Sequence, residues 1–266
     1  SFVPTYFVSR LARQKVTVAL AGDGGDENFA GYDKYAADAR ENRLRGLFPA
    51  QLRQRLFPTL GAMAGRIPHR FGRRARSLFN SLGQDPATAF YMSNRFCDPA
   101  VWNRIINPDL ERATSDYDPA DITRYHYNNA RADDHLSRIL YADFKTYLPG
   151  DILVKVDRMS MANSLETRAP LLDYRFVEFA AGVPSRYKLR GNEKKYLLKK
   201  AFEGRLSGDI LYRKKMGFSV PLAQWLRDEI KSLAEPLLSK GDSPLVHNFR
   251  MEEVIKLWRT HMAGHD

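Results

Sequence analysis

The residues best suited to chemistry lie in segment 21–27, which reads AGDGGDE. The segment follows an apolar run of strand length, Val16–Leu20, and precedes a stretch of helical character over 28–43. Glycines permit close approach of the backbone, and the start of a helix offers free N–H groups to an anion. Three carboxylates would repel a bare phosphate, so a polyphosphate here needs a bridging cation, and oxygen ligands favour Mg²⁺. The segment therefore predicts a magnesium–phosphate site at the carboxyl end of a strand.

The three acids of this segment admit different interpretations. Asp26 and Glu27 fall where a helix begins, and the helix dipole alone favours acids there. For Glu27 this structural role stays open beside a functional one, whereas Asp23 precedes the helix and is the stronger candidate for chemistry. The sequence contains neither Gly-x-x-x-x-Gly-Lys-Ser/Thr nor Gly-x-Gly-x-x-Gly. A P-loop and a dinucleotide fingerprint are therefore excluded within this chain.

A second cluster, 157–173, mixes charged residues with small and apolar ones. Buried charges need partners. We therefore expect internal ion pairs, Asp157 with Arg158 and Glu166 with Arg168, at a junction between helices. A direct role of these residues in substrate binding is the alternative.

A third cluster is the basic run Arg213-Lys214-Lys215, followed by Met-Gly-Phe. Such a loop could close over a polyphosphate. Taken alone, a basic run is more typical of a solvated surface.

The sequence does not support a disulfide, a catalytic nucleophile or a membrane span. The single cysteine, Cys97, cannot close an intramolecular disulfide, which favours a reducing compartment, and we expect the cytoplasm. Cys97 lies outside any triad context, and no Gly-x-Ser-x-Gly elbow occurs, so nucleophilic catalysis is not expected. No apolar run reaches the length of about 18 residues that a membrane span needs.

The 266-residue chain has a net charge of +11, and most of the excess lies between Arg40 and Arg76. Ten arginines face a single acid, Glu41, in this stretch. We interpret it as a solvated face of connecting helices, with a phosphate-rich or acidic partner as the alternative. Only Phe48, Phe57 and Phe71 are interspersed, which argues against stacking of single-stranded nucleic acid.

The elements that must position these residues are mostly helical. Apart from the polar hydroxyl of Thr17, Val16–Leu20 is apolar and rich in β-branched residues, which predicts a strand buried on both faces in a parallel sheet. Prolines, Pro58 among them, divide residues 46–120 into short helices. One parallel strand cannot form a sheet, so partners are expected in weak runs such as Ile152–Val156 or outside this sequence. The free edge of Val16–Leu20 would favour pairing with a second chain, so a homo-oligomer is a further expectation.

Three segments, in this order, resemble the synthetase domain of the glutamine-hydrolysing asparagine synthetase family. Segment 21–32 is similar to the family's Ser-Gly-Glu/Asp-Gly-small-Asp-Glu followed by Phe-x-Gly-Tyr. Segment 157–173 is similar to Asp-Arg/Lys-Met-Ser-Met-Ala…Glu-x-Arg-x-Pro-Phe-Leu-Asp. Segments 194–198 and 213–218 are similar to Lys-x-x-Leu-Arg and Arg-x-Lys-x-x-Phe. The resemblance implies an α/β fold of the adenine nucleotide α-hydrolase type, with one or a few parallel strands in a mostly helical chain.

The resemblance also implies a reaction and residue roles. Such enzymes use ATP and Mg²⁺ to adenylate the side-chain carboxylate of aspartate, and ammonia from glutamine attacks the β-aspartyl-adenylate. Asp23 and Lys215 take catalytic positions, Asp26 the Mg²⁺–pyrophosphate position, and Ala21 and Gly22 backbone positions against ATP. Ala21 replaces the usual serine, which removes a hydroxyl that could bond the nucleotide, and Asp23 is the shorter of the two acids found there.

On this resemblance, residues 1–266 are an incomplete synthetase domain. The family's phosphate loop, Ser-Gly-Gly-x-Asp-Ser, is absent from the sequence, and so is an N-terminal cysteine nucleophile of a glutaminase domain. We expect both upstream, and we expect the chain alone to be inactive. The alternatives are a related amide-forming adenylating enzyme, of the β-lactam synthetase or peptide cyclase type, and a noncatalytic basic helical module for RNA or an acidic partner.

Overall fold

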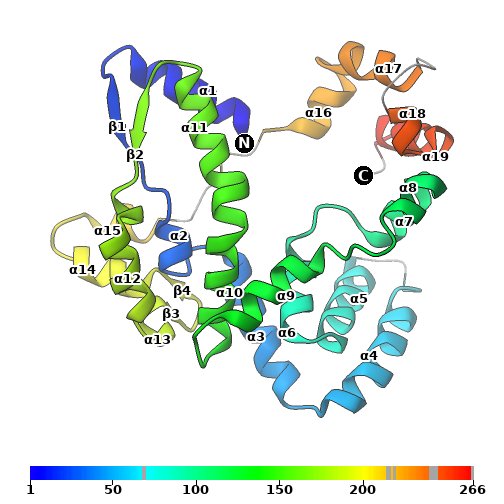
Figure 1. Ribbon diagram of the computed structural model, residues 1–266, viewed down its shortest axis with the longest axis horizontal. Helices are drawn as coiled ribbons and strands as arrows, with labels where there is room; N and C mark the ends of the chain where they lie inside the picture. Colours follow the sequence, from blue (N-terminus) through cyan, green and yellow to red (C-terminus); the bar gives the residue numbers. More distant parts are fainter. Residues whose placement is uncertain (68–69, 214–216, 218–219, 240–244, 265–266) are drawn as a thin grey trace. The chain divides into compact units, whose positions relative to one another are not determined.

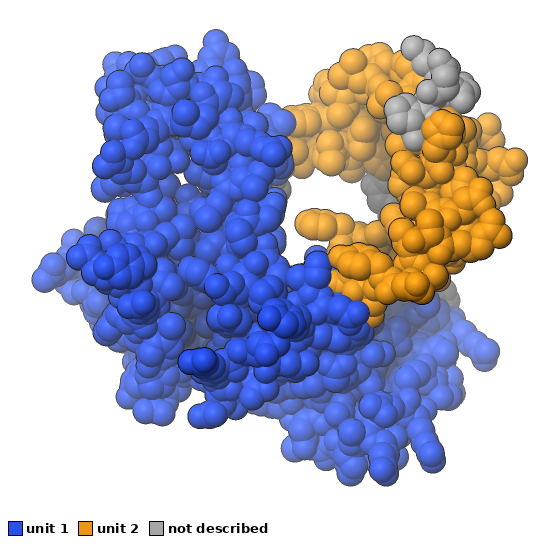
Figure 2. Space-filling model, in the orientation of Figure 1, with its two compact units in different colours: residues 1–94, 120–218 blue, residues 95–119, 219–266 orange. Residues whose placement is uncertain are grey.

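The computed structural model describes residues 1–67, 70–213, 217, 220–239 and 245–264. Two compact units are distinguished in Figure 2: the first is Ser1–Asn94 with Ala120–Phe218, and the second is Arg95–Pro119 with Ser219–Asp266. Segments 21–27 and 157–173 both lie in the first unit. The two clusters that carry candidate chemistry therefore belong to one unit.

Helices dominate the first unit, as the ribbon in Figure 1 shows. Its first part contains α1 (Phe2–Arg13), β1 (Val18–Leu20), α2 (Gly25–Asn28), α3 (Asp33–Gly46), α4 (Ala50–Ala64), α5 (Arg70–Gly83) and α6 (Pro86–Asn94). Its second part contains α9 (Ala120–Asn129), α10 (His135–Lys145), a π-helical turn η1 (Leu148–Leu153), α11 (Val154–Met161), β2 (Glu166–Arg168), a 3₁₀ turn η2 (Pro170–Leu172), α12 (Tyr174–Gly182), α13 (Ser185–Lys188), β3 (Leu189–Arg190), β4 (Glu193–Lys194), α14 (Tyr196–Phe202) and α15 (Gly208–Leu211).

The second unit is built from short helices of two chain segments. They are α7 (Pro99–Ile105), α8 (Pro108–Ala113), α16 (Leu222–Arg227), α17 (Lys231–Ser239), α18 (Leu245–Asn248) and α19 (Met251–Met262). The segments meet where Arg104 pairs with Glu253, Nε to Oε2, at 3.0 Å. A β-bridge between Ile106 and Phe249 adds a second link.

The parallel sheet consists of β1 and β2, which lie side by side in Figure 1. Val18 is opposite Glu166, and Leu20 is opposite Arg168. The expected partner run, Ile152–Val156, is instead helical and belongs to η1 and α11. That expectation is wrong because the real partner is polar, so apolar content could not reveal it.

The strand β1 is more exposed than its composition predicts. Val18 is 42% exposed and Leu20 is 76% exposed, so burial on both faces is wrong for the described residues. A sheet of two strands gives each strand a free edge. Val18 and Leu20, two positions apart, project from the same face of the sheet, and their exposure shows that this face is open as well.

Two helices differ from the sequence-based expectation. The helix expected over 28–43 begins only at Asp33, because Ala30 adopts a φ of +53° and turns the chain between α2 and α3. Pro58 does not end a helix, since it lies inside α4. The described residues are otherwise mainly helical with a short parallel sheet, which agrees with an α/β fold. None of their helices combines the length and the apolar composition that crossing a membrane requires.

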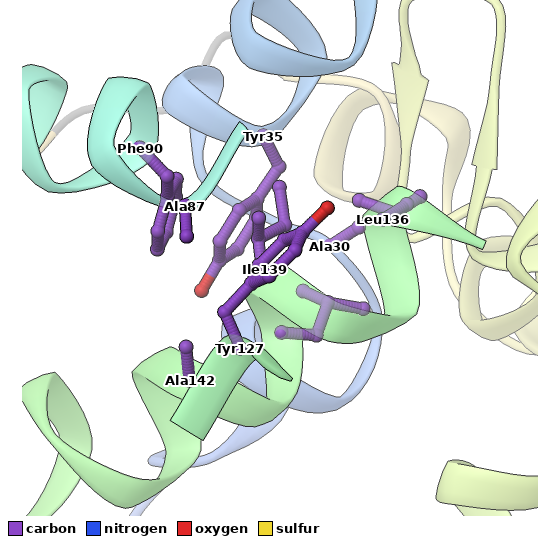
Figure 3. Packing of buried hydrophobic residues seen from close by; sticks show 9 residues of the cluster. Ala30, Tyr35, Ala87, Phe90, Tyr127, Leu136, Ile139 and Ala142 are labelled. Atoms are coloured by element: carbon purple, nitrogen blue, oxygen red, sulfur yellow. The ribbon is translucent and has the colours of Figure 1, made fainter. Parts of the chain in front are cut away.

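The hydrophobic core of the first unit gathers around α10. Ile139 and Ala142 of this helix are fully buried and pack with Ala30, Tyr35 and Phe90 (Figure 3). The rings of Tyr35 and Phe90 stack with their centroids 6.5 Å apart. Burying one large side chain of this kind is worth about 1.5–3 kcal/mol. The core therefore fixes α3, α6 and α10 together and anchors Ala30, which follows the acidic segment directly.

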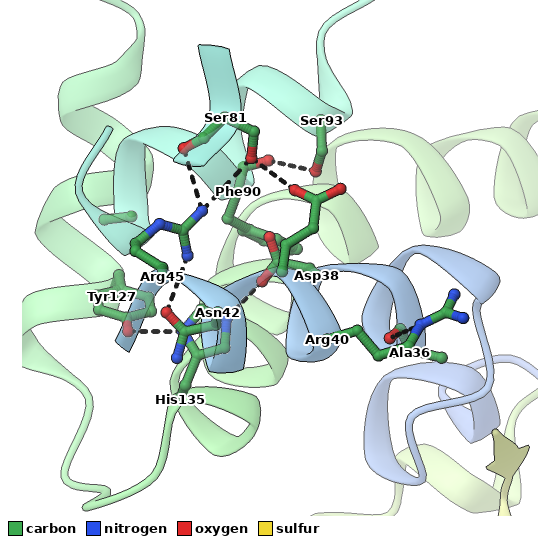
Figure 4. Close-up of polar contacts among 12 residues, drawn as sticks. Ala36, Asp38, Arg40, Asn42, Arg45, Ser81, Phe90, Ser93, Tyr127 and His135 are labelled. Atoms are coloured by element: carbon green, nitrogen blue, oxygen red, sulfur yellow. Dashed lines mark hydrogen bonds and ion pairs between the residues drawn. The ribbon is translucent and has the colours of Figure 1, made fainter. Parts of the chain in front are cut away.

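The basic stretch from Arg40 to Arg76 is not uniformly solvated. Arg45 is only 2% exposed, and its guanidinium donates to the carbonyl oxygen of Ser81 at 3.2 Å (Figure 4). The guanidinium of Arg53 donates to the carbonyl oxygen of Leu82 at 2.9 Å. These two arginines tie α3 and α4 to the end of α5, so the solvated-face interpretation is wrong for them.

Lys188, the last residue of α13, is a buried cation that is only 4% exposed. Burial lowers the pKa of its ammonium group from 10.5 to about 8, and the carboxylate of Asp134 opposes that shift. Between these two values the unfolded chain binds more protons than the folded chain. Stability contributed by this group therefore rises with pH across that window, and below it Lys188 destabilises the fold.

We expect Lys188→Met to be more stable than the wild type at pH 7, by on the order of 2 kcal/mol, because the substitution removes a buried charge. Above a pH of about 8 the gap should shrink, since the folded wild type then loses the proton. The measurement is the difference in melting temperature between the two proteins across this pH range. All other titratable groups are shared, so this difference reports the titration of Lys188. A gap that stays constant with pH would contradict the lowered pKa.

Candidate active site

The chain passes from β1 into α2 through a sharp turn at Gly24. Gly24 has a φ of +84° and is the N-cap of α2. A Cβ added there would lie 2.2 Å from Cδ2 of Leu172. Both the backbone angle and the contact with η2 therefore require glycine, as the sequence predicts for this turn.

Asp23 is partly buried in this turn. Burial is the main cause that raises the pKa of its carboxyl group, the charge of Lys155 opposes this, and the charge of Asp26 adds to it. Lys155 belongs to α11, so that helix supplies the positive charge that most strongly lowers the pKa of Asp23. A carboxylate that is partly removed from water interacts strongly with a charged group or N–H donor that enters beside it.

Asp26 forms an ion pair with Lys195, in which Nζ lies 3.0 Å from Oδ1. Lys195 is the N-cap of α14, with a φ of +54°, and its backbone N–H donates to the carbonyl oxygen of Phe29 at 3.0 Å. Gly31 makes room for the pair, because an added Cβ would lie 1.8 Å from Oδ1 of Asp26 and 2.3 Å from Cε of Lys195. The start of α14 is thus fixed against the acidic segment.

Sequence reasoning missed the importance of Lys195. It belongs to the 194–198 motif, in which the resemblance assigned no role to this lysine. The available signal was the pair of lysines directly before an apolar helical stretch. Its partner, Asp26, is distant in the sequence, so local spacing could not reveal the pair.

Glu27 lies in the first turn of α2, as its structural interpretation expects. It is only 2% exposed, and the hydroxyl of Tyr32 donates to its Oε1 at 2.8 Å. Burial raises the pKa of the Glu27 carboxyl group, and the bond from Tyr32 opposes that shift. Glu27 therefore closes the turn between α2 and α3 from the inside.

Ala21 and Gly22 continue β1 into the turn. The backbone N–H of Ala21 donates to the carbonyl oxygen of Arg168 at 2.7 Å, which extends the pairing of β1 with β2. Gly22 is exposed, and a Cβ added there would meet nothing within 4 Å. Gly22 thus presents exposed backbone at the carboxyl end of the strand, whereas the N–H of Ala21 is used in pairing with β2.

The second cluster forms one of its two expected ion pairs. Asp157 and Arg158 are both exposed on α11, and they form no ion pair with each other among the described residues. Arg168 Nε does lie 2.7 Å from Glu166 Oε1, but both side chains are more than half exposed. The expected pair of Glu166 with Arg168 therefore forms, but it is exposed rather than buried, whereas the expected pair of Asp157 with Arg158 does not form in the described structure.

A cleft of about 730 Å³ opens beside the Asp26–Lys195 pair. Apolar residues of η2, α14 and α15 line it together with four basic residues, Lys194, Lys195, Lys199 and Arg213. Lys215, and Lys214 before it, lie outside the described residues. The lining also includes Asp33, and three of the basic residues are ion-paired, Lys194 with Asp33, Lys195 with Asp26 and Lys199 with Glu193. This mixture of basic residues and carboxylates next to the acidic turn is suited to a polyphosphate that carries a bound cation.

Mg²⁺ fits this site in one particular mode. Among the described residues, no group of three or more His, Cys, Asp or Glu side chains is placed to hold a metal ion. Mg²⁺ is often bound by one or two carboxylates together with phosphates of the substrate. Asp26 suits that mode because it lies beside the basic cleft. The residues fit a metal ion that arrives with phosphate rather than one held by a cage of side chains.

Comparison with known proteins agrees with the motifs. A family model described as asparagine synthase matches residues 1–266. The chain belongs to the asparagine synthase family. The resemblance drawn from segments 21–32, 157–173, 194–198 and 213–218 is thereby confirmed.

Individual proteins similar to this asparagine synthase family chain include synthetases and an amidase. A glutamine-hydrolysing asparagine synthetase 1 of Bacillus subtilis is 31% identical over 266 residues, which cover 98% of this chain and 39% of that protein. A putative glutamine-hydrolysing asparagine synthetase of Mycobacterium bovis is 34% identical over 264 residues, covering 99% and 39%. An amidase, chry2, of Gibberella zeae is 22% identical over 251 residues. The chain spans 39% of the length of the two synthetases.

Proposed function

We propose that this chain supplies part of the site for the ATP-dependent step of asparagine synthesis, on a fold of the adenine nucleotide α-hydrolase type, and that the chain alone is inactive. Aspartate would be activated as the β-aspartyl-adenylate, and ammonia derived from glutamine would form the amide. The observation that carries this proposal is the convergence of Asp23, Asp26 and Lys195 beside a basic cleft of about 730 Å³. Membership in the asparagine synthase family supports it.

Two displacements make up the proposed reaction. An oxygen of the aspartate side-chain carboxylate attacks the α-phosphorus of ATP, the bond from that phosphorus to the bridging oxygen breaks, and pyrophosphate leaves. The nitrogen of ammonia then attacks the acyl carbon, AMP leaves with the electron pair of the broken carbon–oxygen bond, and the nitrogen loses a proton. Each step moves negative charge onto phosphate, so fixed cations at the leaving groups favour it.

The residues of the site divide these tasks. The backbone of Ala21 and Gly22 would lie against ATP, and Lys195 with Lys215 would bind the pyrophosphate oxygens. Asp26 would hold Mg²⁺, which when bound neutralises charge on the departing pyrophosphate. Asp23 would act in both formation and aminolysis of the β-aspartyl-adenylate. In the second step it would accept a proton from the ammonia nitrogen, a task that a raised carboxyl pKa suits.

The comparisons favour aspartate over the other substrates considered. The synthetase relatives are aligned over nearly the whole chain at 31% and 34% identity, whereas the chry2 amidase reaches 22%. The noncatalytic alternative loses support because Arg45 and Arg53, two members of its basic surface, are bonded inside the fold. The β-lactam synthetase and cyclase chemistries have no specific observation in their favour.

The test is exchange of labelled pyrophosphate into ATP by the full-length protein. Exchange should depend on aspartate, because only the adenylate-forming step can be reversed by added pyrophosphate. Glutamate and succinate serve as controls of similar charge. Exchange that is equal with all three acids, or absent with aspartate, would contradict the proposed function.

The basic run offers a sharper test of one assignment. Lys215→Ala should slow exchange by about tenfold or more, because a charge-assisted bond to phosphate is lost. Lys214→Ala is the matched control, since the resemblance places Lys215, and not Lys214, at the family's phosphate-binding position. Steady-state exchange rates at saturating ATP measure both. Equal small effects would assign the run to a solvated surface.

A further inference from the structure

A second cavity lies in the first unit, against α2. It measures about 280 Å³ and is lined from α2, the 130–132 segment, α10, α12 and α13. It shares no lining residue with the cleft of about 730 Å³. Its volume is near the lower end of cavities that hold small organic ligands. The proposed reaction makes no use of it.

Lys188 lines this cavity and is only 4% exposed. The structure gives its ammonium group no hydrogen bond and no ion pair among the described residues, although an ammonium group has three donors to satisfy. Asp134 acts on it only through its charge. A buried cation without a hydrogen-bonded partner is costly. An anion inside the cavity would supply what the ammonium group lacks.

The other walls define what kind of anion fits. Leu140, Phe144 and Val177 give the cavity apolar surface, so a fully hydrated ion such as phosphate would leave those walls unmatched. Arg131 and Lys145 add positive charge to the lining, so that with Lys188 the cations outnumber the two carboxylates, Glu27 and Glu178. The combination matches a ligand with one carboxylate and a compact apolar body.

We propose that this cavity binds a small organic monocarboxylate, with the carboxylate at Lys188 and the apolar body against Leu140, Phe144 and Val177. The ligand would contact the helix that carries Asp26, because Glu27 and Asn28 line the same cavity. Asn28 also donates from Nδ2 to the carbonyl oxygen of Leu171 at 2.8 Å, in the turn that packs on Gly24. Binding of a ligand in the cavity would thus influence the conformation of the acidic turn through α2 and the hydrogen bond of Asn28.

The test uses benzoate as the probe and benzamide, its uncharged analogue of nearly equal shape, as the comparison. Ligand-observed NMR titrations with the full-length protein at pH 7 give both dissociation constants. We expect saturable binding of benzoate that is at least about tenfold tighter than that of benzamide, since a charge-assisted bond to the ammonium group is made only by benzoate.

Lys188→Met should remove the preference for benzoate, and Lys15→Met, at an exposed lysine outside the cavity, should leave it unchanged. Ala132→Leu fills the cavity and should abolish binding of both probes, which gives a second variant that keeps Lys188. Equal binding of the two probes, a preference that survives in Lys188→Met, or no saturable benzoate binding would each overturn the proposal. None of these outcomes depends on pyrophosphate exchange, so the test of this binding site is independent of the test of the proposed function.

Discussion

Replacing Asp23 by Asn should lower aspartate-dependent pyrophosphate exchange by about two to three orders of magnitude. The substitution keeps the shape of the side chain and removes its charge. Fixed charges aimed at the reacting groups commonly contribute this much to a rate. The loss should appear in kcat at saturating ATP and aspartate, because Asp23 is proposed to act on the reacting groups rather than on binding alone.

The fold should tolerate this change. Burial raises the pKa of the Asp23 carboxyl group, so the fold holds this charge at a cost, and a neutral amide removes that cost. Asp116→Asn, at an exposed position of the second unit, is the matched control and should leave exchange within about twofold. Full exchange by Asp23→Asn, together with an unchanged melting temperature, would remove Asp23 from the proposed chemistry.

The acidic turn could be predicted because its constraints act on single residues. A positive φ at Gly24 and close contact with Leu172 leave glycine as the one residue type that fits, so sequence and conformation are linked directly. The helical character of most of the chain was predictable for the same reason, since periodicity is local. The family's motifs were recognisable because they too are short.

Features that depend on distant partners could not be predicted. The partner of β1 is Glu166–Arg168, whose polar composition resembles that of a loop, and parallel pairing carries no local signal. Arg45 and Lys188 are charged residues, a type that usually lies on the surface, yet they are only 2% and 4% exposed. Arg45 is held by the carbonyl oxygen of Ser81 in α5, and Lys188 lines a cavity with residues of α10, so tertiary contacts override the preference of charged residues for water.

Gly31→Ala should reduce exchange by about 100-fold, although the substitution adds a single methyl group. That methyl would lie 1.8 Å from Oδ1 of Asp26 and 2.3 Å from Cε of Lys195, so one or both side chains must move. A displacement of about 1 Å in a positioned group can cost this much in rate. Gly31 is not among the glycines with positive φ, so the effect would be steric rather than a matter of backbone strain.

Gly182→Ala is the matched control for this prediction, because a Cβ at the end of α12 meets nothing within 4 Å. It should leave exchange unchanged, whereas Gly31→Ala should also lower the melting temperature, since overpacking costs about 1–3 kcal/mol. A second arm separates the catalytic loss from the structural one: Lys195→Ala in the Gly31→Ala background relieves the contact with Cε but removes the cation. Loss of the lysine also frees the Asp26 side chain to turn away from the added methyl, which lies 1.8 Å from its Oδ1. If the ion pair positions Asp26 for the metal ion, stability should therefore recover in the double variant while exchange does not. Recovery of both would show that the pair serves the fold alone, and unimpaired exchange in Gly31→Ala would show that the site functions without this geometry.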